Sequence, residues 1–413
     1  METVKLELQK DLARHLRAGH PWVFRRALEK APSGLGAGAI VDVVEKGRFV
    51  ARGFYDPHSH IAVRVLTLDP AEGVGPHFWR RRIARAIALR RAYAPFSDPA
   101  QTDCARLVHG ENDGLPGVVV DLYARFAVLK LYSAGLTPHR AQIVEALRGE
   151  IALEGIYGRD EEASEQSTDD DDSGPDEEAG RAPRGRVLWG SEPPEHVFVR
   201  ENGIALAVDV RAGQKTGFFL DQRENRLALR RYAKGVGDAL NCFSYTGGFS
   251  LALLLHGAAK VTSVDRDAAA LLLARKNFEL NGLDPGAHTF VAADVLEDLA
   301  ARRERAERFD LVVLDPPAYA KTQKAVPAAI DGYASLHRAA LAVLRPGGIL
   351  ATASCSARVS PEEFLTAIRE AAIKSRADLT VLEERRQPPD HPVRIAFPEG
   401  RYLKFFVFRR GDE

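Results

Sequence analysis

Residues 239–265, ALNCFSYTGGFSLALLLHGAAKVTSVD, combine an apolar strand, a tight glycine loop, an apolar helix and a second strand that ends in an acid. Strands and helices continue to alternate after this stretch, and the pattern begins at about residue 201. This alternation is typical of a doubly wound parallel sheet. Ligands of such sheets bind outside the carboxyl ends of the strands. The sequence therefore predicts an α/β fold with its site at those ends.

Five polar residues lie at or just past the ends of the predicted strands: Asn241, Asp265, Asp294, Asp315 and Cys355. An acid at the end of the second strand can accept both hydroxyls of a ribose. The glycine loop contains neither Gly-x-Gly-x-x-Gly nor Gly-Lys-Ser/Thr, so it is poorly suited to nucleotide phosphates. A nucleoside without a pyrophosphate fits better. This favours S-adenosylmethionine, with Asp294 near the adenine amine, and leaves a dinucleotide as the alternative.

The chain before residue 201 divides into two further blocks. Residues 1–72 contain short predicted strands at 4–8, 39–44, 49–54 and 61–66, as in a small β-barrel. Residues 73–200 predict a middle α+β domain that opens with an arginine-rich amphipathic helix at 77–93. That helix either docks on an RNA backbone or is simply solvated.

The balanced net charge hides a basic body. Acidic and basic residues number 57 each, but eleven of the acids lie in residues 160–178, where there is no Lys or Arg. The remaining chain carries eleven more basic than acidic residues, as suits a nucleic-acid binder. Residues 160 to about 185 have almost no apolar side chain and predict a disordered insertion. This insertion either keeps the basic body off other polyanions or is a neutral spacer.

The three cysteines, Cys104, Cys242 and Cys355, are far apart and lack metal-site spacing. We expect neither a disulfide framework nor a metal, and a reducing cytoplasm. The N-terminus has no secretory signal and no stretch is long enough to span a membrane. Most lone cysteines are small buried hydrophobes. Cys355 differs because it follows an apolar strand, after a helix at 331–344 and a turn at 345–348.

Several long motifs resemble one known family, the large-subunit ribosomal RNA cytosine-C5 methyltransferases that carry an N-terminal PUA domain. The resemblance covers nearly the whole chain except the acidic insertion. The matching segments are residues 19–24, 108–117, 213–223, 241–249, 315–317, 390–392 and 402–404. The resemblance implies a Rossmann-like class I methyltransferase domain at 201–413, preceded by a PUA domain and the middle domain. It also implies S-adenosylmethionine as the methyl donor and large-subunit ribosomal RNA as the partner, and leaves open whether the chain forms a homodimer.

The family resemblance makes Cys355 the nucleophile by its position in Ser354-Cys355-Ser356. Carbon 5 of cytosine is a weak nucleophile, and a thiolate added to carbon 6 makes it reactive. Asp315 would hydrogen-bond the ring near N3 and stabilise the addition. Related RNA enzymes often carry a second cysteine beside the strand-four proline, where this chain has Pro316-Pro317-Ala318-Tyr319. The base that removes the C5 proton is therefore not identified.

Strand ends and resemblance together predict two sets of binding residues. The cofactor set is Lys215, Thr216, Gly217, Phe218, Asn241, Phe243, Ser244, Gly247, Gly248, Asp265, Arg266, Asp294 and Asp315. The RNA set is His20, Arg25, Arg26, Arg80, Arg81 and Tyr319, with Arg64 as a further phosphate candidate. Tyr319 could stack on a flipped base or serve in the core or a lid.

Two other functions stay open. Asp-Pro-Pro followed by an aromatic residue also occurs in enzymes that methylate exocyclic amines, which need no thiol. In that case Cys355 would be inert. The other alternative is an RNA-binding assembly factor with a catalytically silent methyltransferase fold. The suitable residue at every predicted cofactor position argues against silence.

Overall fold

The computed structural model describes residues 3–93, 98, 100–159 and 185–413. The predicted acidic insertion at 160–185 lies outside the described residues, except for Gly185. The described chain divides into two compact units. Unit 1 comprises residues 1–200, 208–220 and 389–400, and unit 2 comprises residues 201–207, 221–388 and 401–413. The predicted boundaries at residues 72 and 200 stay predictions.

The first sheet of unit 1 has the strand order β1-β3-β4-β5-β2. Its strands are β1 (Val4–Glu7), β2 (Trp22–Phe24), β3 (Ile40–Glu45), β4 (Arg48–Tyr55) and β5 (Ile61–Thr67), with α1 (Ala13–Arg17) between β1 and β2. A bridge between Leu8 and Leu28 joins the chain just beyond the two edge strands. The sheet therefore curls toward a barrel, as the sequence predicts.

The second sheet of unit 1 has the order β10-β9-β8-β7-β6. Its strands are β6 (Cys104–His109), β7 (Val118–Tyr123), β8 (Phe126–Leu131), β9 (Gly155–Arg159) and β10 (Gly185–Gly190). The helices α2 (Pro76–Tyr93) and α3 (Arg140–Glu150) belong to the same core. Trp79 and Ile83 of α2 are fully buried, which confirms the predicted apolar face. Strands β9 and β10, which precede and follow residues 160–184 in the chain, pair antiparallel.

Unit 2 is built on a seven-stranded sheet of order β15-β14-β13-β16-β17-β19-β18. Its strands are β13 (Asp238–Cys242), β14 (Lys260–Asp265), β15 (Thr289–Ala292), β16 (Phe309–Leu314), β17 (Leu344–Ser354), β18 (Leu379–Arg385) and β19 (Lys404–Arg410). The first five are parallel, whereas β19 pairs antiparallel with both β17 and β18. The predicted doubly wound α/β sheet is confirmed, and β18 and β19 are an antiparallel addition to it.

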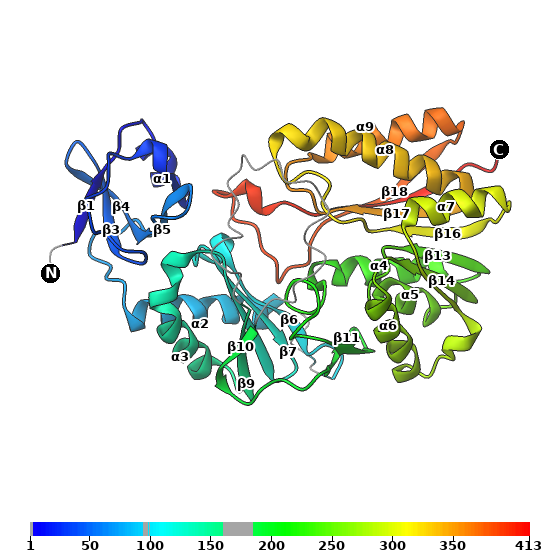
Figure 1. Cartoon of the computed structure of the whole chain (residues 1–413), viewed down its shortest axis with the longest axis horizontal. Coiled ribbons are helices and arrows are strands. Elements are labelled where there is room, and N and C mark those ends of the chain that lie inside the picture. The colour runs from blue at the N-terminus through cyan, green and yellow to red at the C-terminus, as the bar shows by residue number, and fades with distance from the viewer. Residues whose placement is uncertain (1–2, 94–97, 99, 160–184) are drawn as a thin grey trace. The chain divides into compact units, whose positions relative to one another are not determined.

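Helices cover both faces of this sheet (Figure 1). One face carries α4 (Arg223–Ala233), α5 (Gly248–Leu254) and α6 (Ala268–Leu280), and the other carries α7 (Val295–Glu304), α8 (Val326–Val343) and α9 (Pro361–Ser375). Short 3-10 helices lie at 25–27, 110–113, 134–139, 220–222, 285–287, 323–325 and 398–400, and β11 (Val197–Glu201) pairs with β12 (Ile204–Val208).

The segment before Cys355 differs from the sequence prediction. Helix α8 begins at Val326 rather than at residue 331, with a proline in its first turn. The predicted turn at 345–348 is instead part of β17, which begins at Leu344. The pairing of β16 with β17 shifts register between Phe309 and Leu311, so the strand accommodates the Pro-Gly-Gly sequence through an irregularity.

Candidate active site

The carboxyl ends of β13, β14, β16 and β17 lie along one edge of the sheet. Strand order reverses between β13 and β16, because the chain runs from β13 toward β15 and then returns to the other side of β13. Such a reversal opens a crevice in which doubly wound sheets bind ligands. Asp265, Asp315 and Cys355 end or follow three of these strands, as predicted.

The loop between β13 and α5 has an unusual backbone. Phe243 and Tyr245 have positive φ angles of 60° and 46°, and Gly247 has a φ of 83°. A Cβ atom at Gly247 would lie 3.2 Å from the Cβ of Ala274 on α6, a tight contact, and the positive φ would strain any other residue there. Left-handed conformations at non-glycine residues cluster at ligand sites, where the surrounding structure holds them.

Asp265 fixes the shape of this loop. Its carboxylate accepts hydrogen bonds from the backbone N–H groups of Tyr245, at 2.7 Å, and Asp267, at 2.9 Å. Burial raises the pKa of the Asp265 carboxyl above its ordinary value, although both hydrogen bonds oppose the change. A carboxylate has about four acceptor positions, so these two bonds leave capacity for ribose hydroxyls.

Three buried polar atoms around the loop test whether a nucleoside-type cofactor fits. Asn241 Oδ1, Ser244 Oγ and Thr246 Oγ1 have no hydrogen-bond partner among the described residues. The other end of the Asn241 amide donates to Ser250 Oγ at 2.9 Å. An unpaired buried polar atom costs about 1–3 kcal/mol. A bound ligand rich in donors and acceptors would remove this cost, so the loop fits S-adenosylmethionine.

Cys355 directly follows β17 and is partly exposed, whereas Cys104 and Cys242 are buried. Burial raises the pKa of the Cys242 thiol far above its usual range, so that sulfur stays protonated in the core. Cys355 is therefore the cysteine best placed to react with a ligand in the crevice.

The two serines that flank Cys355 are tied to α8. The Tyr333 hydroxyl lies 2.9 Å from both Ser354 Oγ and Ser356 Oγ. Ser356 Oγ also accepts a hydrogen bond of 3.0 Å from the backbone N–H of Tyr319. The Ser356 hydroxyl thus connects the Cys355 segment with the loop that follows Asp315.

Lys404, the first residue of β19, places a positive charge beside the same segment. Its side chain is buried, and Nζ donates hydrogen bonds to the carbonyls of Ser356 (2.6 Å), Val359 (2.9 Å) and Tyr402 (2.9 Å). Burial lowers the pKa of Lys404 to about 8, and the nearby Cys355 and Glu363 partly oppose this change. Sequence reasoning missed this role, although a lysine that opens an apolar strand was a usable signal.

Asp315 is oriented by a chain of two side-chain amides. Gln222 Nε2 donates to Asp315 Oδ1 at 2.8 Å, and Asn225 Nδ2 donates to Gln222 Oε1 at 2.7 Å. Gln222 and Asn225 are both buried, so the chain fixes the rotamer of Asp315 from the protein interior. Sequence reasoning had assigned no role to either residue.

The remaining predicted cofactor residues of unit 2 have mixed surroundings. Asp294 is exposed and caps α7 by accepting from the N–H groups of Leu296 and Glu297. Gly248 opens α5, and Arg266 is exposed just beyond β14. Cofactor contact for these three residues stays a prediction.

Residues 215–218 belong to unit 1, whereas the other predicted cofactor residues belong to unit 2. Thr216 is buried and donates to Asp121 Oδ2 at 2.6 Å, and the N–H of Phe218 donates to the Tyr123 hydroxyl at 3.2 Å. Within unit 1 these bonds pin the loop to the middle sheet. Lys215 is exposed, with its ammonium 4.5 Å from the centre of the Phe219 ring.

The predicted RNA residues of the first sheet differ in how much charge they leave available. Arg64 is buried near Asp56, which makes it a poor phosphate ligand and corrects that prediction. Arg25 Nη2 donates to the carbonyls of Asp56, Pro57 and Ser59, so this guanidinium serves partly to hold a turn. Arg26 is exposed. His20 stacks on His15 and lies 3.4 Å from Glu399 Oε1.

The other three predicted RNA residues also have protein partners. Arg80 pairs with Glu150 at 3.1 Å and Arg81 pairs with Glu72, which reduces the free charge of α2. The Tyr319 ring stacks on Tyr333 with 4.7 Å between ring centres. One face of Tyr319 is therefore covered by the core, as the core-or-lid alternative expects.

Within the described ranges, no group of three or more His, Cys, Asp or Glu side chains is arranged to hold a metal ion. None of the helices in this part of the chain is long and apolar enough to cross a membrane.

The fold and site define a class I methyltransferase that uses S-adenosylmethionine. A family model for the S-adenosylmethionine-dependent methyltransferase matches residues 181–409, and a PUA-like domain model matches residues 6–68. The chain is 39% identical over 408 residues to Ribosomal RNA large subunit methyltransferase I from Citrobacter koseri, covering 98% of this chain and 99% of that protein. The same-named protein of Klebsiella pneumoniae is also 39% identical over 408 residues, with 98% of each chain covered. The chain belongs to this methyltransferase family.

Solved structures agree on the fold. A Streptococcus mutans protein described as an S-adenosylmethionine-dependent methyltransferase has a TM-score of 0.82 and 24% identity, covering 98% of this chain and 100% of that one. A second chain with the same score and identity was solved with S-adenosylhomocysteine, and the match covers 99% of this chain and all of that one.

Proposed function

We propose that this protein methylates carbon 5 of a cytosine in large-subunit ribosomal RNA through a covalent adduct between Cys355 and carbon 6. The observation that carries the proposal is the position of Cys355: a partly exposed thiol just past β17, beside the strand that leads to Asp315. The full-length relatives are named for ribosomal RNA of the large subunit. A PUA-like domain and the basic body of the chain suit the same partner.

The chemistry begins at the thiolate. Cys355 Sγ forms a bond to carbon 6, and the electron pair released from the C5–C6 double bond makes carbon 5 nucleophilic. When bound, S-adenosylmethionine would supply an activated methyl group on its sulfonium sulfur. Carbon 5 would take this methyl group, with S-adenosylhomocysteine as the leaving group. A base then removes the C5 proton, the double bond re-forms and the bond to Sγ breaks, which restores the thiolate.

Protein groups around Cys355 support the formation of the thiolate and its addition to the ring. The Lys404 ammonium favours a negative charge on the nearby sulfur. Asp315, held by Gln222, hydrogen-bonds the ring edge near N3 and stabilises the addition. Pro316, Pro317 and Ala318 offer no second thiol for proton removal or release. That base has to come from another side chain or from water.

A trapping experiment tests the proposal. Large-subunit RNA transcribed with 5-fluorocytidine carries fluorine where the C5 proton would leave, so the adduct cannot resolve. With S-adenosylmethionine, the wild-type enzyme should form an RNA–protein complex that survives denaturing electrophoresis, and so should Cys104→Ser. Cys355→Ser should form none.

Mass spectrometry of the methylated RNA separates the alternatives. The expected product is 5-methylcytidine. A nucleoside methylated on an exocyclic amine, together with full activity of Cys355→Ser, would contradict the adduct and favour the Asp-Pro-Pro chemistry. Binding of RNA without any methyl transfer would favour a silent assembly factor. A ribosomal substrate also accords with the cytoplasmic location that the cysteine usage predicts.

A further inference from the structure

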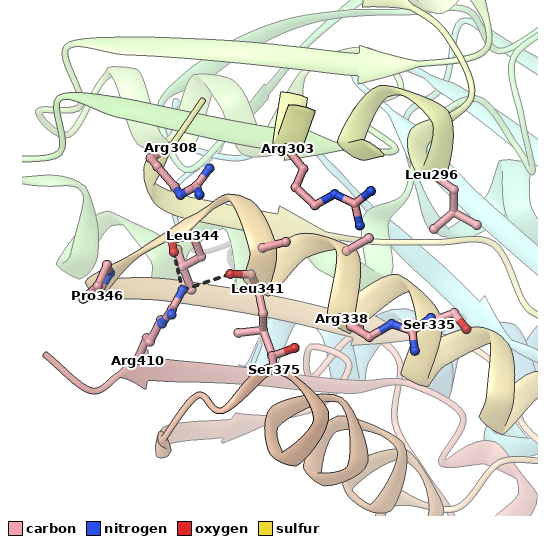
Figure 2. Close-up of a pocket in the computed structure, with 12 residues that line it drawn as sticks. Leu296, Arg303, Arg308, Ser335, Arg338, Leu341, Leu344, Pro346, Ser375 and Arg410 are labelled. Carbon is pink, nitrogen blue, oxygen red and sulfur yellow. Dashed lines mark hydrogen bonds between the residues drawn. The ribbon is translucent and has the colours of Figure 1, made fainter. Parts of the chain in front are cut away.

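A cavity of unit 2 has none of the predicted site residues in its lining. It has a volume of about 550 Å³ and is lined by residues of α7, α8, α9, β17 and β19 and by the turn before β16 (Figure 2). Leu344, at the start of β17, forms part of its wall. Because β17 spans 11 residues from Leu344 to Ser354, the part of the cavity at Leu344 lies roughly 30 Å from Ser354 at the usual rise of a strand, whereas Leu296 in the first turn of α7 lines its other side.

The lining of the cavity is positively charged. It includes Arg303, Arg308, Arg338 and Arg410 and no acidic residue. Figure 2 shows Arg303 and Arg308 on one side and Arg338 on the other. We call this feature the arginine cavity.

Most of this charge is not neutralised by the protein. Arg303 and Arg338 are exposed, and their side chains make no hydrogen bond or ion pair within the part of the chain that the structure describes. Arg308 donates to the backbone carbonyl of Glu307. Arg410 donates to the carbonyl of Leu341 at 2.9 Å and to that of Leu344, which are neutral acceptors.

Neighbouring acids are already paired with other arginines. Glu307 bonds Arg302 and Arg305, each at 2.6 Å, and Asp310 bonds Arg345. Burial lowers the pKa of Arg410, and the neighbouring Arg308 adds to this change. A concave group of unpaired cations of this kind attracts anions strongly.

The chemistry of the lining indicates which anion. Guanidinium groups bind phosphate oxygens through two parallel N–H donors. The hydroxyls of Ser335 and Ser375 add neutral donors, and leucines at the base of the cavity suit a sugar or base. The volume also falls in the range of ordinary ligand pockets and exceeds what one phosphate needs.

We propose that the arginine cavity binds backbone phosphates of the substrate RNA, at a second contact on the edge of the sheet opposite Cys355. The inference rests on the proposed RNA substrate and adds a requirement to it. The RNA has to extend well beyond the methylated base to occupy both edges of the sheet.

The test is the salt dependence of RNA binding by the full-length enzyme. The probe is in vitro transcribed large-subunit ribosomal RNA, and filter binding is measured over a series of KCl concentrations with S-adenosylhomocysteine present. In Arg303→Gln/Arg338→Gln, the slope of log affinity against log salt should fall by about two, one for each lost phosphate contact. Unchanged calorimetric affinity for S-adenosylmethionine checks that this variant is folded.

A charge-matched control separates the cavity from general basicity. Arg230 and Arg369 are exposed helical arginines of unit 2 outside the cavity. Arg230→Gln/Arg369→Gln should retain the wild-type slope. An equal loss in the control, or no loss in the cavity variant, would overturn the proposal.

Two further arms identify the anion and protect the proposed function. Inorganic phosphate and cytidine monophosphate are titrated into wild-type enzyme by calorimetry. Tight binding that disappears in the cavity variant would assign the cavity to a small anion and overturn the RNA assignment. If wild-type enzyme forms the 5-fluorocytidine adduct while the slopes do not differ, only the cavity proposal fails. If neither RNA binding nor adduct is seen with wild-type enzyme, the proposed function itself fails.

Discussion

The two edges of the seven-stranded sheet differ in how their polar groups are used. At the carboxyl edge, Tyr333 bonds the hydroxyls of Ser354 and Ser356, and Lys404 bonds three backbone carbonyls, through hydrogen bonds of 2.6–2.9 Å. At the opposite edge, Arg303 and Arg338 have no such partners among the described residues. Fixed geometry suits bond making, whereas exposed cations suit attraction of a polyanion. This difference is expected if methyl transfer takes place at the carboxyl edge and RNA is bound at the opposite edge.

The largest expected effect comes from removing the nucleophile. Cys355→Ser should lower the rate of methyl transfer by at least about 10³-fold, because a neutral hydroxyl replaces a thiolate. Calorimetry should show unchanged S-adenosylmethionine affinity. Cys104→Ser is the matched control and should retain activity. Loss of activity in both variants would break the distinction between a reactive and a buried thiol.

The next effect concerns Asp315 and the amide that orients it. Asp315→Asn should reduce kcat by about 10²-fold, as for loss of one transition-state hydrogen bond. Gln222→Leu removes only the orienting bond of 2.8 Å and should reduce kcat by a smaller factor with little change in KM. Steady-state kinetics on ribosomal RNA measures both. A larger loss in Gln222→Leu than in Asp315→Asn would argue that Gln222 acts directly.

The lowered pKa of Lys404 predicts that kcat depends on pH. Its pKa of about 8 means that the ammonium is charged below that pH and becomes neutral above it. If the charge supports the Cys355 thiolate, kcat should fall above pH 8, by up to about tenfold per pH unit. Glu363, the other group that acts on Lys404, caps α9 through the N–H of Ser360 at 2.7 Å. In Lys404→Arg the side chain stays charged and the fall should move to higher pH.

Two outcomes would contradict this interpretation. One is an identical fall above pH 8 in Lys404→Arg. The other is a wild-type profile that keeps rising with thiol ionisation. Thermal unfolding of the variant, followed by circular dichroism, shows whether the buried arginine is tolerated.

The smallest expected effect concerns the hydroxyl between the two serines. Tyr333→Phe removes hydrogen bonds to Ser354 and Ser356 and should lower the free energy of unfolding by about 1–2 kcal/mol. Tyr319→Phe keeps the ring stacking on Tyr333 and should change stability by less than about 0.5 kcal/mol. Urea denaturation compares the two. Equal stability losses would show that the network around Cys355 does not depend on Tyr333.

Prediction from sequence worked where a local pattern carried the information. The pattern of apolar and glycine residues in 239–265 predicted β13, the glycine loop, α5 and β14 nearly at their observed bounds. Prediction failed where a local turn signal lies inside a strand that is paired on both sides of it. Pro346-Gly347-Gly348 is typical of a turn, yet β17 runs through it as an irregularity, with Leu344 and Ile349 paired to β16 on either side and Gly347 at a φ of 74°. The antiparallel strands β18 and β19 and the helices α7 and α9 were not predicted.

Candidate phosphate ligands show the same limit. Arg25, Arg64, Arg80 and Arg81 were selected for their charge, but most of them have protein partners. The free arginines of the cavity were not selected. Whether a guanidinium is paired depends on acids that are distant in the chain, and sequence spacing does not report those contacts.

The sequence by itself determined the α/β class, the glycine loop, the acids at the strand ends and the cysteine that follows β17, because periodicity and strand ends are local properties of the chain. Only the tertiary structure decided which polar atoms remain available. It placed Lys404 beside Cys355 across an antiparallel pair, and Gln222 against Asp315. It also assembled the arginine cavity from helices and strands more than 100 residues apart. Burial and pairing are long-range properties, so they fix where the charge and the reactivity of this methyltransferase lie.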